Sequence, residues 1–366
     1  MNYAKPDMPF PAVAEIISLN YQGEGIRDAP AYELLQGIHT SPLYASFHQK
    51  YPDKVILSSE TSSTLSSRGT YLFPVYEGMS APVSDGSGGD PVKQSVSAYE
   101  IYTSAFGASP DRVFEEQDKN PFVAGEFVWS GWDYLGEPTP YYSARSSYSG
   151  IIDLAGFKKD RFYLYQSRWR PELRIAHILP HWTWPGRSGK ITPVHLFTSG
   201  DWAELFLNGK SQGVRKKGNN EYRLRWDSVK YEPGIIKAVV YKNGKKWAED
   251  VAETAGEPAM LKAEADRSII NADGKDLSFI TVMVTDSKGT TVPYADNTIE
   301  FSVEGPGNII ATDNGDPTDM VPFLSARRKA FNGKMIGIFS SERPGTFTVN
   351  VKSPGLRSTI VRLKSH

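Results

Sequence analysis

The chain has 366 residues, and its 41 lysines and arginines nearly balance its 42 aspartates and glutamates, so the formal net charge is -1. This length predicts two to three domains at ~100–200 residues each, and the charge balance gives no general electrostatic reason to bind nucleic acid or an anionic membrane. The absence of cysteine excludes disulfides, thiolate nucleophiles and cysteine-ligated zinc.

Alternating strands and helical or loop segments are predicted in the first half of the chain. Apolar runs favour buried strands, and the second of them leads directly to Glu60. Strands that alternate with helical stretches indicate parallel βα units. The expected elements are strands at 14–21, 54–58 and 122–129, a helix-like pattern within 28–51, a loop at 80–91 and a helix at 95–105.

Short strands at close spacing are predicted in the second half. Asn208-Gly209 and Asn243-Gly244 follow two of these strands, and Asn-Gly is a strong hairpin turn signal. Such strands with Gly/Pro turns are typical of β-sandwiches, and two fit, over about 186–256 and 257–366. The expected strands are 194–198, 203–207, 234–241, 278–285, 298–303 and 345–351.

Carboxylates and tryptophans gather where the buried strands end. Glu60 follows the second strand, and the third strand holds Glu126 and Trp129, with Asp133 close behind. In a βα barrel the carboxyl ends of the strands carry the catalytic groups. A Trp there can stack on the apolar face of a pyranose while carboxylates bind its hydroxyls. The alternative is a capping Glu among core tryptophans.

Several long motifs then carry a family resemblance. They are FVWSGWDYLGEPTPY at 127–141, GIIDLAGFKKD at 150–160, WAELFLNGKSQG at 202–213, and ITVMVTD at 280–286 with GPG at 305–307. Together they resemble the C-terminal part of the bacterial β-galactosidase-like branch of glycoside hydrolase family 2. The resemblance implies a multidomain α/β plus all-β chain, in which the incomplete C-terminal part of a (β/α)₈ TIM barrel (1–185) precedes two Ig-like β-sandwiches (186–256 and 257–366).

The resemblance also implies roles for individual residues. Glu60 matches the nucleophile at the end of the seventh barrel strand, and Tyr21 matches the sixth-strand position whose hydroxyl supports it. Trp129 matches the residue that shapes the sugar subsite, and Asp133 and Glu126 are candidates for sugar contacts. We expect no cofactor and no metal. Arg68, behind the nucleophile, is expected to pair with an acid rather than to bind substrate.

The second catalytic carboxylate is missing from the expected place. Retaining glycosidases need two carboxylates ~5–5.5 Å apart, and in this family the acid/base is a Glu preceded by Asn. Asn220-Glu221 is the one such pair, and it lies in a predicted sandwich. A full barrel takes ~250 residues, so we expect the chain to begin near strand six and to be part of a longer enzyme.

An incomplete barrel has physical consequences for partners. Three parallel strands cannot close, so they leave open edges and an exposed apolar face. We expect a complementary chain or self-association, with the acid/base supplied in trans or by a surrogate such as Glu24 or Glu126. No segment reaches the ~20 apolar residues that span a bilayer.

Three other polar motifs do not predict a metal or nucleic-acid site. His177 and His181 have i, i+4 spacing, but Pro180 between them disfavours a helical metal pair. Residues 85–90 and 313–316 place acids near glycines, but neither fits an EF-hand, so turns are the better interpretation. Arg327-Arg328-Lys329 is too short a basic run to predict nucleic-acid binding.

Two functions therefore remain open from the sequence. The first is part of a retaining glycosidase that cleaves terminal β-glycosidic bonds, with β-galactosides favoured and glucuronides and mannosides open. The second is a non-catalytic carbohydrate-binding or interaction module. The first ten residues lack an apolar h-region, so we expect no secretory signal there, while the family suggests a periplasmic or secreted location for the full-length protein.

Overall fold

The computed structural model describes residue 1, residues 4–22 and residues 42–366. Contacts between residues divide the chain into two compact units. The first comprises Met1–Asp153, Lys158–Pro180 and Arg187–Ala252, and the second comprises Leu154–Phe157, His181–Gly186 and Glu253–His366. The boundaries predicted for three domains stay a prediction.

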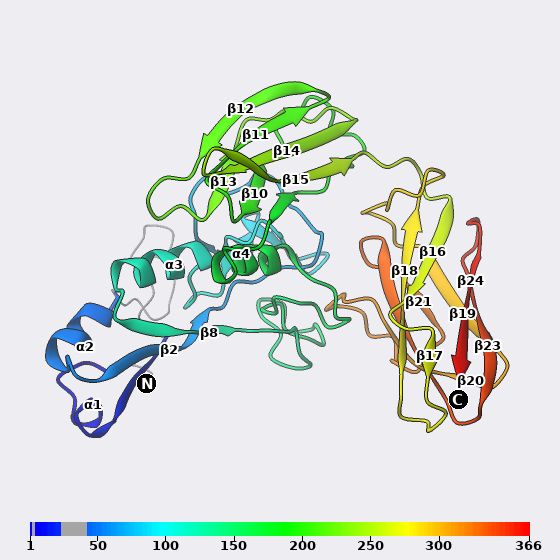
Figure 1. Cartoon of the computed structure of the whole chain (residues 1–366), viewed down its shortest axis with the longest axis horizontal. Coiled ribbons are helices and arrows are strands. Elements are labelled where there is room, and N and C mark those ends of the chain that lie inside the picture. The colour runs from blue at the N-terminus through cyan, green and yellow to red at the C-terminus, as the bar shows by residue number, and fades with distance from the viewer. Residues whose placement is uncertain (2–3, 23–41) are drawn as a thin grey trace. The chain divides into compact units, whose positions relative to one another are not determined.

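Strands outnumber helices in the described chain (Figure 1). No described helix is both long enough and apolar enough to cross a membrane. Most of the helix-like pattern expected within 28–51 lies outside the described residues. The described helices are α1 (Pro9–Val13), α2 (Tyr44–Lys50), α3 (Pro110–Lys119) and α4 (Asp160–Trp169).

A three-stranded parallel sheet lies near the N-terminus, with its strands in the order β1-β2-β8. Its strands are β1 (Ile16–Asn20), β2 (Val55–Ser62) and β8 (Val123–Trp129), which confirms the three strands predicted there. β2 is the central strand, and it continues past Glu60, where the predicted strand ended, to Ser62.

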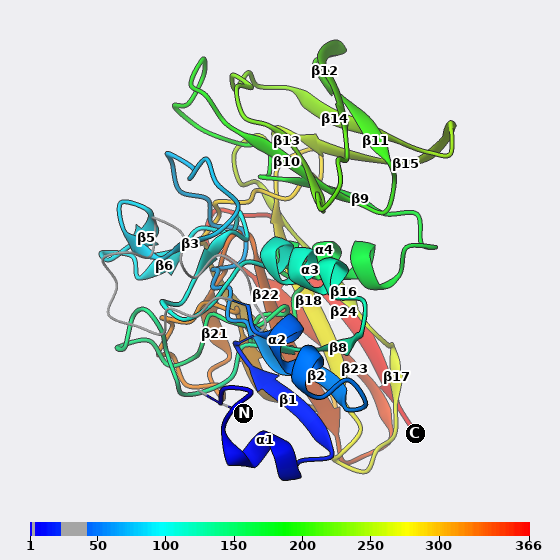
Figure 2. The same cartoon turned by 90° about the vertical axis from the view of Figure 1, so that its left-hand side faces the viewer.

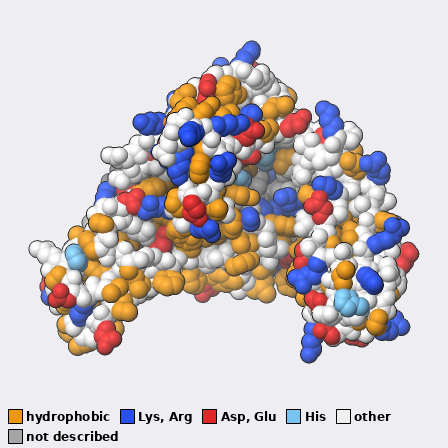
Figure 3. All heavy atoms as spheres, in the orientation of Figure 1, with side chains coloured by type: hydrophobic (Ala, Val, Ile, Leu, Met, Phe, Trp, Pro, Cys, Tyr) orange, Lys and Arg blue, Asp and Glu red, His pale blue; other side chains and the backbone are white. Residues whose placement is uncertain are grey.

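The two faces of this sheet differ in burial. Ile17, Leu19 and Ile56 are buried against Tyr44 and Phe47 of α2, and Figure 2 shows α2 beside β1 and β2. Side chains on the other face of the sheet are exposed to solvent: Ile16, Val55 and Phe127 are 49%, 50% and 65% exposed. Apolar side chains accordingly follow the edge along β8 in Figure 3.

The helix expected at 95–105 is wrong. The segment is buried from residue 95 to residue 104 and contributes only β6 (Ser95–Val96) and β7 (Tyr102–Thr103). Glu100 has φ of 58°, which a right-handed helix does not allow, and Ala98 N donates to Thr70 O at 2.7 Å. Distant backbone partners override local propensity here.

The neighbouring short strands are β3 (Ala81–Pro82), β4 (Ser84–Asp85) and β5 (Gly88–Asp90).

Two further sheets complete the first unit, in the orders β13-β10-β9 and β12-β11-β14-β15. The strands predicted at 194–198, 203–207 and 234–241 are confirmed, and β11 buries Ala203, Leu205 and Leu207 with the period of two expected for a sheet. The strands are β9 (Ala176–Leu179), β10 (Val194–Thr198), β11 (Trp202–Leu207), β12 (Lys210–Lys216), β13 (Arg223–Trp226), β14 (Ile235–Lys242) and β15 (Lys245–Glu253).

A buried ion pair fastens these sheets to the first part of the unit. Arg223 of β13 donates from Nε to Asp111 of α3 at 2.9 Å. Its other nitrogens donate to the carbonyls of Tyr99 at 2.7 Å and Glu100 at 3.0 Å. This one side chain joins a β-sheet to α3 and to the buried 95–105 segment.

The second unit is a β-sandwich. Its sheets have the orders β16-β18-β22-β20 and β17-β24-β23-β19-β21, and residues of both form one apolar core that includes Val282, Phe301, Phe339 and Phe347. The strands predicted at 278–285, 298–303 and 345–351 are confirmed. The strands are β16 (Met260–Ala265), β17 (Ile269–Ile270), β18 (Ser278–Thr285), β19 (Thr298–Glu304), β20 (Gly307–Asp313), β21 (Arg327–Lys329), β22 (Lys334–Ser341), β23 (Gly345–Lys352) and β24 (Thr359–Ser365).

Candidate functional site

The carboxyl ends of the three parallel strands bring the predicted site residues to one edge of the sheet. Asn20, the last residue of β1, is in register with Glu60 of β2. Ser62, the last residue of β2, is in register with Trp129, the last residue of β8. Parallel strands place their carboxyl ends together, so residues far apart in sequence meet here.

Glu60 is held by a residue that the sequence did not single out. Asn20 donates from Nδ2 to Glu60 Oε2 at 2.6 Å. This bond takes one carboxylate oxygen and fixes the plane of the group. The signal was the position of Asn20 as the last residue of an apolar strand, next to Tyr21 and opposite Glu60.

Tyr21 reaches Glu60 through its backbone. Its amide donates to the carbonyl oxygen of Glu60 at 2.9 Å, and its φ of 53° turns the chain sharply after β1. The buried ring packs edge-on against Phe106, with centroids 5.1 Å apart. These contacts place the Tyr21 backbone beside Glu60, and support of the carboxylate by the Tyr21 hydroxyl stays a prediction.

An aromatic cavity of about 300 Å³ opens beyond the ends of β2 and β8. Trp129 lines it and meets Tyr134 edge-on at 5.7 Å, and Phe106 connects it with Tyr21. Aromatic faces with hydroxyls suit a polar ring that has apolar faces. The lining comprises Ser63, Leu65, Ser104, Phe106, Trp129, Tyr134, Glu137, Pro138, Thr139, Tyr142, Ser147, Tyr148 and Ser149.

Glu126 does not line this cavity. Its Oε2 accepts a hydrogen bond from Thr61 Oγ1 at 2.7 Å. Burial raises the pKa of the Glu126 carboxyl, and the Thr61 hydrogen bond partly offsets this rise. The side chain therefore belongs to the layer between the sheet and the helices.

Asp133 is enclosed in a polar network. Its Oδ1 accepts from Gly150 N at 2.7 Å, and its Oδ2 lies 2.7 Å from Lys159 Nζ, with both side chains 1% exposed. Burial raises the pKa of Asp133 to about 6, against the opposing effect of Lys159. With both oxygens occupied, this geometry favours a structural role over the predicted sugar contact.

Arg68 confirms the expectation that it pairs with an acid. Its Nε bonds Asp153 Oδ2, and both side chains are buried. The guanidinium therefore joins two loops that follow the ends of β2 and β8.

The histidines and acidic turns for which a metal site was considered have other partners. His177 bonds Asp160 at 2.7 Å and stacks on Tyr163, while His181 stacks on Trp184. Asp313 accepts from Gly315 N at 2.7 Å, as in a turn. In the described part of the chain, no group of three or more His, Asp or Glu side chains is arranged to hold a metal ion.

Comparisons with known proteins agree on one family. Residues 261–362 match the model described as glycoside hydrolase family 2 C-terminal domain 5, and residues 189–248 match a domain of unknown function. A β-galactosidase of Bacteroides ovatus is 39% identical over 96% of this chain and 39% of its own length. A putative β-glucuronidase of Formosa agariphila is 36% identical over 58% of this chain and 21% of its own length.

A solved structure extends this similarity to the fold. A β-glycosidase from Bacteroides vulgatus matches with a TM-score of 0.80 at 30% identity, over 96% of this chain and 45% of that one. The chain thus spans less than half the length of each of these proteins.

Proposed function

The chain belongs to glycoside hydrolase family 2, and we propose that it carries the nucleophile of a retaining glycosidase acting on terminal β-galactosides. We also propose that β1, β2 and β8 are the last three strands of a (β/α)₈ barrel. The observation that carries the proposal is the position of Glu60 near the end of the central strand, with its carboxylate held by Asn20 at 2.6 Å.

The proposed chemistry is a double displacement. A Glu60 oxygen attacks the anomeric carbon as the bond to the leaving oxygen breaks, and a second carboxylic acid protonates that oxygen. Water then attacks the glycosyl ester, and the same second group accepts its proton. The Asn20 bond leaves one Glu60 oxygen for attack and restricts the rotation of the carboxylate, which favours a near-attack geometry.

The second carboxylate is proposed to come from a complementary chain or segment that completes the barrel. Glu126 is bonded to Thr61 in the layer beneath the helices, and Glu24 lies outside the described residues. The exposure of Ile16, Val55 and Phe127 on one sheet face supports a covering partner. Self-association of the chain is the other form of this proposal.

Sugar binding is proposed for the aromatic cavity. Trp129 and Tyr134 offer ring surface, and Ser63 and Ser149 offer hydroxyls. A β-galactoside is preferred because the β-galactosidase relative matches 96% of the chain, whereas the β-glucuronidase relative matches 58%. A β-glucuronide is the second candidate substrate.

Hydrolysis of dinitrophenyl β-galactoside and β-glucuronide tests this function, because this leaving group needs little acid assistance. In this proposal the base for the second step is not supplied by this chain, so we expect about one equivalent of dinitrophenol to be released from the galactoside per chain. This release should be lost in Glu60→Gln and kept in the exposed control Glu15→Gln. Equal release by Glu60→Gln refutes the nucleophile, and faster release from the glucuronide reassigns the sugar. Sugar binding without release, unchanged in Glu60→Gln, supports the non-catalytic module.

A further inference from the structure

A second cavity, of about 500 Å³, lies within the first unit between α4 and the strands β12 and β14. Arg168 of α4 lines it from one side, and Lys216, Lys217 and Lys242 line it from the other, with Asp201 as the acid among them. We propose that this cavity binds the oxyanion group, carboxylate or sulfate, of an acidic carbohydrate.

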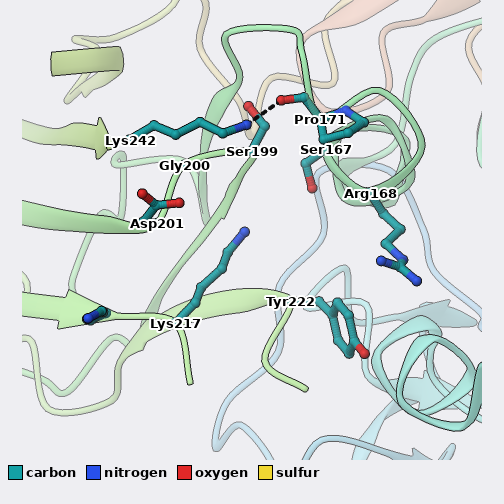
Figure 4. A pocket seen from close by; sticks show the side chains of 10 residues that line it. Ser167, Arg168, Pro171, Ser199, Gly200, Asp201, Lys217, Tyr222 and Lys242 are labelled. Carbon is teal, nitrogen blue, oxygen red and sulfur yellow. Dashed lines mark hydrogen bonds between the residues drawn. The ribbon is translucent and has the colours of Figure 1, made fainter. Parts of the chain in front are cut away.

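The arrangement of the ammonium groups supports an anionic ligand. Figure 4 shows Lys217 and Lys242 entering from the strands and Arg168 from the opposite side. Lys217 Nζ donates to the carbonyl of Thr198, and Lys242 Nζ donates to that of Pro171 at 2.6 Å. Lys242 Nζ also lies 4.7 Å from the centroid of the Trp247 ring. Because an ammonium has three N–H groups, each lysine still has donor capacity beyond these contacts.

The local acids leave this positive charge under-compensated. Asp201 Oδ2 accepts from Asn243 N at 2.8 Å, and Arg168 pairs with Asp118 outside the lining. No ion pair within 4 Å joins Lys217 or Lys242 to a carboxylate of the described chain. An oxyanion would satisfy several converging donors through charge-assisted bonds.

The pKa of Lys217 is consistent with this picture. It is lowered from 10.5 to about 8, chiefly by burial. Lys242 and Arg168 contribute to this lowering, whereas Asp201 and Asp111 act in the opposite direction. A bound anion would raise the pKa again, so binding and protonation of Lys217 are coupled.

The size of the cavity argues for more than a bare ion. About 500 Å³ falls in the range of small-molecule sites, ~300–1,000 Å³. Because the chain belongs to a glycosidase family, we expect the anionic group to be part of a carbohydrate. The cavity is separate from the residues around Glu60. The inference therefore stands or falls independently of the nucleophile.

Calorimetric titration of the full chain at pH 7 tests the proposal. The ligands are methyl β-glucuronide, galactose 6-sulfate, methyl β-galactoside and inorganic phosphate. Glu60→Gln is the background, so binding at the proposed active site can be recognised by comparison with wild type. Lys217→Gln and Lys242→Gln remove lining cations, and Lys210→Gln removes an exposed lysine of β12 as the control.

We expect the acidic sugars to bind more tightly than the neutral sugar and phosphate. Each lining variant should weaken that binding by about 10-fold, the scale of one charge-assisted bond, with Lys210→Gln unchanged. Binding should also weaken from pH 7 to 9, except in Lys217→Gln. Unchanged binding by Lys217→Gln and Lys242→Gln overturns the site, and phosphate binding as tight as that of the sugars overturns the carbohydrate carrier.

Discussion

Replacing Lys159 by Met should destabilise the first unit strongly. The ammonium is 1% exposed and lies 2.7 Å from Asp133 Oδ2. It also donates to the carbonyls of Ser66 at 2.8 Å and Tyr148 at 3.0 Å. One side chain thus joins the segments that follow β2 and β8, which line the aromatic cavity.

The expected loss follows from what Lys159→Met leaves behind. Asp133 becomes a buried carboxylate without its cation, and breaking a buried pair in this way costs about 3–5 kcal/mol. The double variant Lys159→Met/Asp133→Asn removes the stranded charge and keeps an acceptor for Gly150 N. We therefore expect it to be more stable than Lys159→Met, with a coupling energy of about 1–3 kcal/mol.

The loss should also depend on pH. Burial already raises the pKa of Asp133 to about 6, and loss of Lys159 raises it further. The unfolded chain releases this proton near its ordinary value of 3.8, so folding of Lys159→Met weakens as pH rises from about 4 through the folded pKa. The deficit should be smaller at pH 5 than at pH 8.

Urea unfolding followed by tryptophan fluorescence and circular dichroism measures these free energies, with unchanged slopes as the check on comparison. Asp133→Asn serves as the matched single variant. A cost below about 1 kcal/mol for Lys159→Met, or a double variant as unstable as the sum of the singles, refutes the structural role of this pair.

Three further predictions concern the sheet face, the cationic cavity and the nucleophile. Phe127→Ser should reduce self-association in light scattering while costing less than about 0.5 kcal/mol, because the ring is 65% exposed; a wild-type monomer contradicts this. Lys217→Met should stabilise the fold at pH 7, because the pKa of Lys217 falls from 10.5 to about 8 on folding; this shift limits the gain in unfolding free energy to about 3 kcal/mol. The gain should shrink as pH rises from 8 to 10.5, and a gain that does not change with pH argues against titration of Lys217 as its cause. Asn20→Ala should slow glycosylation of Glu60 by about 10-fold through loss of one hydrogen bond to a charged group; an unchanged rate shows that the bond does not orient the nucleophile.

Patterns of burial explain what could be predicted from sequence. β18 and β11 alternate buried and open residues in a period of two, so their strands were predictable. Residues 95–104 are all buried and show no such period, so local propensity misled the prediction of a helix at 95–105. Its structure depends on backbone bonds to residues 65–83, which no local window contains.

The site was predictable only in part for a similar reason. Motif position indicated Glu60, Tyr21 and Trp129, and the strands bring these together. The direction of a side chain is not encoded in a motif, so the contacts of Glu126 with Thr61 and of Asp133 with Lys159 were not predicted. The sugar contacts expected for these two carboxylates stay predictions. Asn20 was missed because its role depends on register between β1 and β2.

Trapping of the glycosyl ester tests the central claim most directly. The chain is incubated with an activated 2-deoxy-2-fluoro-β-galactoside, which slows ester hydrolysis, and is then digested and analysed by mass spectrometry. The account predicts one adduct, on Glu60, absent in Glu60→Gln and retained in Glu15→Gln. An adduct on another residue, or none from a chain shown to be folded, contradicts the assignment of Glu60 as the nucleophile.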